Sequence, residues 1–445
     1  MTSPRSAAES ARCPLFGVLG LVLAIGGCGG AATSPPGDDA GTTGGATGSG
    51  GADDVGSGGR TGGGTGGGTG GATGGAPSTG GNGSGGGVSS TGGRVGTGGT
   101  GGTMTSGTGG AAGGAAGGAG LGLWIAPDGL DTNPGTEAMP LKTLAAASAR
   151  AAPGTTIWVK AGTYPSAVTV NLNKAGTEAA PYRILAAPGA RPVFDFAAQP
   201  RGSSAARGFA LRGDYWHIKG VDVINAGDNC IHISGSHNTI EWVVTHGCDD
   251  TGIQITVDSS LAGDATRGAY NTILNCDSYE NYDSTTGGEN ADGFAAKLYI
   301  GPGNVFRGCR AWNNSDDGWD FFASNDAVVL DGCWAFSNGK TAAGATNPNG
   351  DGNGFKLGGA PTAGDVNMGG AIHQVTGCFA FENLACGFVR NNNTMVPVLS
   401  MCGGRADPKG EYCSLTNTGA KTFTMTAAQA KAVPRNADGS LPPIN

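Results

Sequence analysis

The sequence has few charged residues, and the acidic ones are in excess. Asp, Glu, Lys and Arg together make up 13% of the 445 residues, and the formal net charge is −8. A nucleic-acid partner requires clustered basic side chains, which the chain lacks, so we expect no nucleic acid to bind. It also has no C-x-x-C pair, no H-E-x-x-H motif and only five scattered histidines, which argues against a zinc site.

The N-terminal apolar run, residues 15–25, is too short to span a bilayer. It follows two arginines and ends in the tetrapeptide Ile-Gly-Gly-Cys28, which resembles a bacterial lipobox. The resemblance implies a lipoprotein signal peptide at 1–27 and a lipid on Cys28. The exported protein would then be lipid-anchored in the cell envelope, at the outer membrane or cell surface, with no other membrane contact. The alternative is an ordinary signal peptide that is cut near a chance cysteine.

Glycine, by contrast, is abundant, with 89 residues, and it makes up nearly half of residues 29–120. A segment of this composition cannot bury enough apolar surface to offset its ordering entropy, so we predict disorder there. The glycines do not follow a strict Gly-X-Y period with proline, which excludes collagen. We therefore divide the chain into the signal peptide, a glycine- and threonine-rich tether at 28–120, and one folded domain at 121–445.

The domain contains an internal repeat with the pattern cysteine, any residue, small, aromatic, any residue, asparagine. Its four copies are Cys276–Asn281, Cys309–Asn314, Cys333–Asn338 and Cys378–Asn383. A period of about 22–25 residues with short strands is typical of a parallel β-helix. We predict an all-β fold, a right-handed parallel β-helix. Leucine-rich repeats share this length, but no L-x-x-L-x-L frame is visible.

Both ends of the domain depart from the repeat. Residues 142–152 have helical composition and are expected to cap the first coil, because an open coil exposes strand edges. Residues 405–445 hold few strand signals and are predicted to be irregular.

The repeated Cys and Asn have distinct expected roles. Each Asn can pair with its copy one coil away, and the four repeated cysteines suit small, inward, reduced positions. Cys402 and Cys413 lie outside this pattern and are the best candidates for a disulfide.

A recurring glycine sets the register between coils. Counted from that glycine, positions +1 and +3 are apolar and point inward, so position +2 points outward. Asp320 and Lys356 then share one outward column, and Asp292 lies above Asp317, with Asp316 beside it. His232 also falls at +2 and is expected at the surface.

Four carboxylates thus converge on two neighbouring coils. Like charges this close raise one another's pKa unless a cation neutralises them, and a cluster of oxygen ligands favours Ca²⁺. The alternative for any single Asp is a solvated turn residue before glycine.

Three strings that surround these residues resemble the pectate lyases of polysaccharide lyase family nine. They are Asn290–Leu298, Asn313–Phe321 and Asp351–Gly359. The resemblance implies one catalytic Ca²⁺ held by Asp292, Asp316, Asp317 and Asp320, with Lys356 as the base. The implied substrate is an acidic polysaccharide, polygalacturonate. Lys297 is a second candidate for the base, and Arg310 could neutralise an acidic sugar.

The expected reaction is β-elimination, in which a base removes the C5 proton and the C4 oxygen leaves. Because a lysine must be deprotonated to act as a base, we expect an alkaline optimum. One alternative is a non-catalytic surface glycan-binding β-helix or adhesin with a structural calcium. Another is a hydrolase, which would need a carboxylate pair free of metal. We expect the protein to be a monomer.

Overall fold

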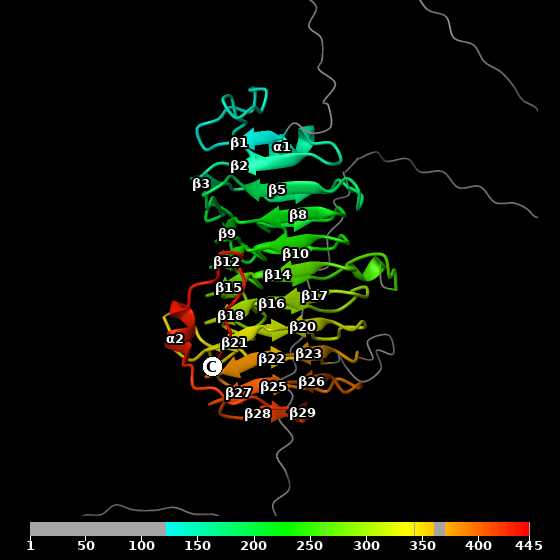
Figure 1. Cartoon of the computed structure of the whole chain (residues 1–445), viewed down its shortest axis with the longest axis vertical. Coiled ribbons are helices and arrows are strands. Elements are labelled where there is room, and N and C mark those ends of the chain that lie inside the picture. Colours follow the sequence, from blue (N-terminus) through cyan, green and yellow to red (C-terminus); the bar gives the residue numbers. More distant parts are fainter. Residues whose placement is uncertain (1–121, 262, 342, 360–369, 445) are drawn as a thin grey trace, which may run out of the picture. The chain divides into compact units, whose positions relative to one another are not determined.

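The computed structural model describes residues 122–261, 263–341, 343–359 and 370–444 (Figure 1). The predicted signal peptide, the tether and Cys28 lie outside these residues. Among the described residues, we find no helix of the length and apolar character that a membrane crossing requires.

In the described part of the chain, twenty-nine short strands form three parallel sheets, and each strand pairs in register with the equivalent strand of the next coil (Figure 1). Sheet A contains β1 (Leu123–Ile125), β2 (Thr156–Val159), β5 (Tyr182–Ala186), β8 (Trp216–Lys219), β11 (Thr239–Glu241), β14 (Thr272–Leu274), β17 (Val305–Arg307), β20 (Val329–Asp331), β23 (Gln374–Thr376), β26 (Val398–Ser400) and β29 (Asn417–Thr418). Sheet B contains β3 (Thr163–Pro165), β6 (Val193–Asp195), β9 (Asp222–Ile224), β12 (Val244–His246), β15 (Asp277–Tyr279), β18 (Arg310–Trp312), β21 (Trp334–Phe336), β24 (Phe379–Phe381) and β27 (Gly403–Arg405). Sheet C contains β4 (Val170–Leu172), β7 (Phe209–Leu211), β10 (Ile231–Ile233), β13 (Ile253–Ile255), β16 (Phe294–Ala296), β19 (Trp319–Asp320), β22 (Phe355–Lys356), β25 (Cys386–Val389) and β28 (Gly410–Cys413). This is the predicted all-β parallel β-helix.

The repeated Asn residues form a buried ladder at one turn of the coil. Asn281 Nδ2 donates to Asn314 Oδ1 at 2.8 Å, and the pattern continues through Asn338 and Asn383 to Asp407. The backbone N–H of each ladder Asn also donates to the next side chain along the stack. The ladder therefore satisfies turn groups that the strands leave unpaired, as predicted.

The repeated cysteines are buried and free, as predicted, but the disulfide expected between Cys402 and Cys413 is wrong. Cys402 precedes β27, which pairs with β24, so it extends the buried cysteine column beyond Cys378. Cys413 instead bonds to Cys386. A second disulfide, Cys230–Cys248, was not predicted.

A short helix covers the N-terminal end of the solenoid, as predicted. α1 (Leu144–Arg150) begins after Thr143, whose side chain accepts a hydrogen bond from the Ala146 N–H, and its apolar side packs towards β1 and β4 (Figure 1).

The prediction that residues 405–445 are irregular is wrong for their first part, because β28 and β29 continue the coil. The chain then folds back over the outer face of sheet B and contains a second helix, α2 (Ala427–Ala432) (Figure 1).

Arg310 fixes this C-terminal segment. Its guanidinium pairs with Asp277 at 2.8 Å and donates to two main-chain oxygens, those of Ala430 and Val433. Arg310 is thus part of the buried structure, whereas the sequence had left open whether it contacts an acidic sugar.

Candidate functional site

The carboxylates and the lysine singled out in the sequence lie together on the outer side of sheet C. The register of β16, β19 and β22 places Asp320 directly beside Lys356 and Asp292 beside Asp317. Strand alternation directs Asp320 and Lys356 away from the solenoid core, whereas Asp292 and Asp317 lie in the turns two residues before β16 and β19; all four are buried. The structure therefore brings the predicted residues into one crowded, polar cluster.

Three of the four carboxylates form a tight group. One oxygen from each of Asp292, Asp316 and Asp317 lies within 4.8 Å of the others. Asp320 lies beside this group, where its two oxygens are 3.3 Å from Lys297 Nζ and 3.9 Å from Lys356 Nζ.

Hydrogen bonds hold the three carboxylates in place but do not use all of their oxygens. Asp292 Oδ1 accepts from the Asp317 N–H, and Asp316 accepts from the N–H groups of Asn290 and Asp351. Asp317 Oδ1 accepts from both the backbone and the side chain of Asn353. Asp317 Oδ2 is buried and accepts no hydrogen bond from the described residues, although Lys356 Nζ lies 3.4 Å away.

The electrostatics of the group favour a bound cation. Burial raises the pKa values of Asp292 and Asp317 well above the ordinary range, and neighbouring carboxylates add to the shift. Burial, with Asp351 and Asp320 nearby, raises the pKa of Asp316 to about 6. A divalent cation would supply the missing positive charge and a partner for the orphan oxygen. Clustered carboxylate oxygens suit Ca²⁺, so the residues present fit that ion.

Lys356 is held by carboxylates on more than one side. Its Nζ lies 2.9 Å from Asp351 Oδ2, and it faces the ring of Phe322 at 6.0 Å. Burial lowers the pKa of Lys356, but the surrounding carboxylates outweigh this effect and raise it well above the ordinary value. Sequence reasoning missed Asp351, although it opens the third of the family-like strings.

Lys297 occupies the other side of the group. Its Nζ lies 3.2 Å from Asp292 Oδ2 and 3.3 Å from Asp320 Oδ2. Lys297 therefore bridges two buried carboxylates on neighbouring coils. Lys356 instead lies between the buried Asp317 and the exposed Asp351. The two candidate bases have different surroundings in the same cluster.

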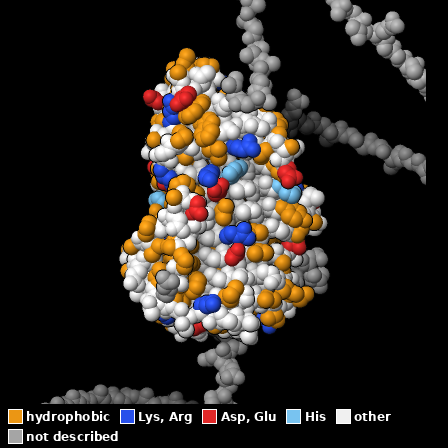
Figure 2. Space-filling model, in the orientation of Figure 1, with side chains coloured by type: hydrophobic (Ala, Val, Ile, Leu, Met, Phe, Trp, Pro, Cys, Tyr) orange, Lys and Arg blue, Asp and Glu red, His pale blue; other side chains and the backbone are white. Residues whose placement is uncertain are grey.

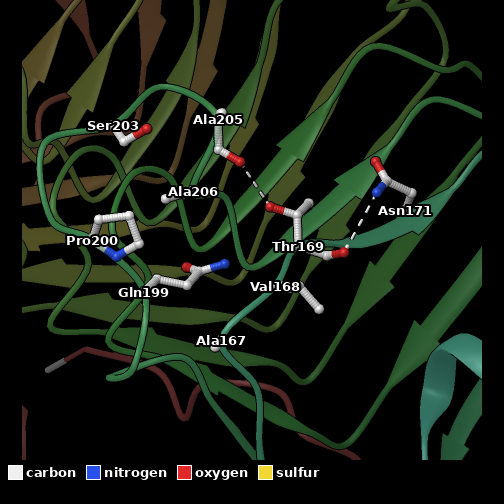
Figure 3. A pocket seen from close by; sticks show the side chains of 9 residues that line it. All are labelled: Ala167, Val168, Thr169, Asn171, Gln199, Pro200, Ser203, Ala205 and Ala206. Atoms are coloured by element: carbon white, nitrogen blue, oxygen red, sulfur yellow. Dashed lines mark hydrogen bonds between the residues drawn. The ribbon is translucent and has the colours of Figure 1, made fainter.

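His232 is not a surface residue as expected, because it is only 3% exposed. The outward row was assigned correctly, since His232 pairs in register with Gln254 and Ala210, but its side chain is buried there. On the face drawn in Figure 2, cationic and anionic side chains lie interspersed along the solenoid. A hollow of about 340 Å³ lies at the N-terminal end of sheet C, beside Asn171 and the loop around Ser203 (Figure 3).

The fold and the site together define a parallel β-helix protein with a carboxylate and lysine cluster on one outer face. Residues 123–413 match the family described as the Pel9A-like, right-handed β-helix region, so the chain belongs to that family. The membership also confirms the predicted handedness of the solenoid.

Several known proteins are similar over the solenoid. Pectate lyase L of Dickeya chrysanthemi is 40% identical over 277 residues, which cover 61% of each chain. Pectate lyase L of Paenibacillus polymyxa is 41% identical over 309 residues, 66% of this chain and 67% of the relative. The match thus spans about 61% of the length of the Dickeya relative.

Two solved structures share the architecture. The crystal structure of pectate lyase Pel9A is 33% identical with a TM-score of 0.60, and it covers 73% of this chain and 89% of that chain. A rhamnogalacturonan lyase is 25% identical with a TM-score of 0.60, and it covers 73% of this chain and 96% of that chain.

Proposed function

We propose that the protein is a calcium-dependent lyase that cleaves polygalacturonate by β-elimination, with Lys356 as the base. The observation that carries this proposal is a group of three buried carboxylates with a lysine on the adjacent coil of the same face. Relatives named pectate lyase, at 40–41% identity, support polygalacturonate as the substrate.

Ca²⁺, when bound, would stabilise the negative charge that develops on the C6 carboxylate of the sugar as its C5 proton leaves. Asp292, Asp316 and Asp317 would hold the ion, and Asp320 would complete the ligand set. Lys356 takes the C5 proton, and the electron pair of that C–H bond forms a C4–C5 double bond. The C4–oxygen bond breaks in the same elimination, and its electron pair leaves with the oxygen, which takes up a proton in place of the one removed from C5, so that no water is consumed.

The base must be neutral when it accepts the proton. The carboxylates around Lys356 raise its pKa well above the ordinary value, so a rise in pH increases the reactive fraction. A bound cation would partly cancel those carboxylate charges and would lower this pKa. We therefore expect the rate to rise from neutral to alkaline pH. A rate maximum below about pH 7 would contradict lysine as the base.

The test is the release of unsaturated uronides from polygalacturonate, followed by their ultraviolet absorbance, with Ca²⁺ and with a chelator. We expect activity that the chelator removes and added Ca²⁺ restores. Asp317→Asn should lose Ca²⁺ binding and activity together. Asp331→Asn, which removes an exposed carboxylate paired with Arg307 on sheet A, is the matched control and should keep both.

Two other outcomes identify the alternatives. Ca²⁺ binding without activity on any polyuronate would indicate a glycan-binding protein or adhesin with a structural calcium. Saturated products, formed with or without chelator, would indicate a hydrolase.

We also propose that the protein is exported and held in the cell envelope by a lipid on Cys28. The lipobox-like tetrapeptide before this residue supports the proposal. Detergent phase partitioning of the protein from its native host is the test. The wild type should enter the detergent phase and Cys28→Ala the aqueous phase, whereas identical partitioning of both would contradict the anchor.

A further inference from the structure

The outer face of sheet A, which the proposed reaction does not use, carries a row of polar side chains over five consecutive strands. Strand register places on this row, in order from β2 to β14, Thr156, Arg183, His217, Thr239 and Thr272. All five residues are half-buried, so a ligand can reach them from the solvent. Four strand spacings, roughly 19 Å, separate the first from the last. The row is therefore long enough for several sugar units.

Arg183 gives this row an unpaired positive charge. Its guanidinium forms no hydrogen bond or ion pair with any residue that the structure describes. The charges on the next two strands neutralise one another, because His217 Nε2 lies 2.8 Å and Lys219 Nζ 2.6 Å from the two carboxylate oxygens of Glu241. On a chain of net charge −8, this guanidinium is available to pair with a carboxylate of a ligand.

A stack of three rings lies along one side of the row. Each ring belongs to the turn that enters sheet A, two residues before a member of the row: Tyr215, His237 and Tyr270. The ring centroids are 4.6 and 4.9 Å apart, and His237 and Tyr270 are exposed. All three residues have a left-handed backbone, with φ between 54 and 59°. This conformation favours glycine, and Gly303 takes the same place in the next coil, so the turn itself does not require the rings.

Apolar side chains lie along the other side of the row. Trp124, Trp158 and Leu185 are in-register neighbours on the outward row two residues further along the strands, and all are half-buried. The two tryptophan rings are stacked, with centroids 5.8 Å apart. Figure 2 looks onto this face: hydrophobic side chains lie over β1 and β2, and Lys, Arg and His side chains lie over β5 and β8. The polar row thus has ring-bearing residues on both sides.

We propose that this outer face of sheet A, from β2 to β14, is an accessory site that binds an acidic polysaccharide apart from the reaction centre on sheet C. Arg183 pairs with a uronate carboxylate. The rings pack on the apolar faces of sugar units, and the threonine hydroxyls form hydrogen bonds with sugar hydroxyls. The identity of the polysaccharide rests on the proposed function. The site holds the protein on a long polymer, so it raises affinity for the polymer without changing the cleavage of short oligosaccharides.

The test measures polymer binding in a protein that is expected not to cleave the polymer. The full chain with Asp317→Asn is run in native gels that contain polygalacturonate, and its retardation gives an apparent Kd. Arg183→Ala or Tyr270→Gly is then added to this background. Because Gly303 occupies the equivalent position in the next coil, the turn accommodates glycine at 270. Thermal unfolding checks that each variant is folded.

We expect Arg183→Ala to weaken binding about tenfold, through the loss of a charge-assisted contact, and Tyr270→Gly to weaken it about fivefold, through the loss of a ring contact. Lys421→Ala removes an exposed cation at the C-terminal end of the solenoid. Met401→Gly removes an exposed side chain at a φ of 53°. These two variants are the matched controls and should bind like the parent. Unchanged binding in Arg183→Ala or Tyr270→Gly, or an equal loss in the controls, would overturn the site.

A methyl-esterified polymer tests the role of charge. The parent should bind it more weakly than polygalacturonate, and Arg183→Ala should remove most of this difference, because the ester cannot form the ion pair. A preference for polygalacturonate that persists in full in Arg183→Ala would contradict the proposed contact.

The same variants separate this site from the lyase. With Asp317 intact, Arg183→Ala and Tyr270→Gly should cleave trigalacturonate at the parent rate, and slower cleavage would overturn an accessory role. If the intact protein cleaves no polyuronate but binds polygalacturonate through Arg183 and Tyr270, the site stands and the reaction is rejected. If it is an active lyase whose variants bind the polymer like the parent, the reaction stands and the site is rejected. Absence of polygalacturonate binding by the Asp317→Asn parent would also reject the site.

Discussion

The outer faces of sheets B and C belong to the same coils but are used in opposite ways. On sheet B, Trp312 stacks between Tyr279 and Phe336, with ring centroids 4.4 and 5.6 Å apart, and the C-terminal segment 423–444 covers the stack. On sheet C, the equivalent outward positions hold Asp320 and Lys356, which face other polar groups.

The difference shows that only the outward side chains vary between the two faces, while the core and the turns of each coil stay the same. The inward residues of both sheets form one continuous apolar core, and the ladders at the turns repeat regardless of what points outward. An outward aromatic row would leave a large apolar patch in water, so the chain covers it. An outward row of carboxylates and lysines can instead bind ions and polar ligands.

The largest expected effect concerns the charged face. Lys356→Ala should lower the lyase rate about 10²- to 10⁴-fold, the usual contribution of a general base, and should leave Ca²⁺ binding intact. Initial rates and a calorimetric Ca²⁺ titration measure the two properties. Lys297→Ala must be measured beside it, because this lysine, the second candidate for the base, bridges Asp292 and Asp320 in the same cluster. Loss of turnover in Lys297→Ala alone would move the base to Lys297.

On the apolar face, the sensitive property is stability. Trp312→Ala should lower the free energy of unfolding by about 3–5 kcal/mol, because it removes a buried ring from the stack. Trp242 is more exposed, at 38%, so Trp242→Ala should cost far less. Urea unfolding gives both values. If both variants lost the same free energy of unfolding, the aromatic stack under the C-terminal segment would add no particular stability. Folded Trp312→Ala protein should keep its activity.

A pH-dependent effect on stability is expected where the Asn ladder ends in an acid. Asp407 Oδ2 and Glu411 Oε2 have no donor among the described residues, and burial raises the pKa of Asp407 to about 8. Because the folded-state pKa is raised above the ordinary 3.8, stability is fully present below about pH 4 and is lost as the pH rises towards 8. The slope is at most about 1.4 kcal/mol per pH unit.

Asp407→Asn tests this assignment, since an amide continues the ladder without titrating. Thermal unfolding between pH 5 and about 8 should show the wild type losing stability and the variant remaining nearly constant. Asp438→Asn, at an exposed turn, is the control. Parallel curves for wild type and Asp407→Asn would show that Asp407 does not titrate in this range.

The repeat pattern was sufficient to predict the ladders and to bring the site residues together. One recurring Asn per coil implied the Asn281–Asn383 stack, and counting from glycine placed Asp320 beside Lys356. Both inferences work because in-register parallel coils turn equal sequence positions into spatial neighbours. Residues 142–152 predicted the capping helix from local composition alone, and the helix lies within that range.

The wrong predictions concern residues whose contacts lie outside the repeated strand and turn positions. The Cys386–Cys413 disulfide joins neighbouring coils through a position that the repeat phrase does not mark, and Cys402 proved to be part of the repeat column. Arg310 contacts a segment about 120 residues later in the chain, which no periodicity reveals. His232 was assigned to the correct row, but alternation along a strand does not reveal that this outward position is buried.

The sequence by itself therefore determined the period of the solenoid, its inward and outward rows and the grouping of four aspartates with a lysine. These properties depend on local alternation and on register, which repeat from coil to coil. Only the tertiary structure decided which outward row is covered, which cysteines bond and which polar atoms stay unpartnered. Those outcomes depend on how the loops and the C-terminal segment pack against the coils, and each such contact occurs only once.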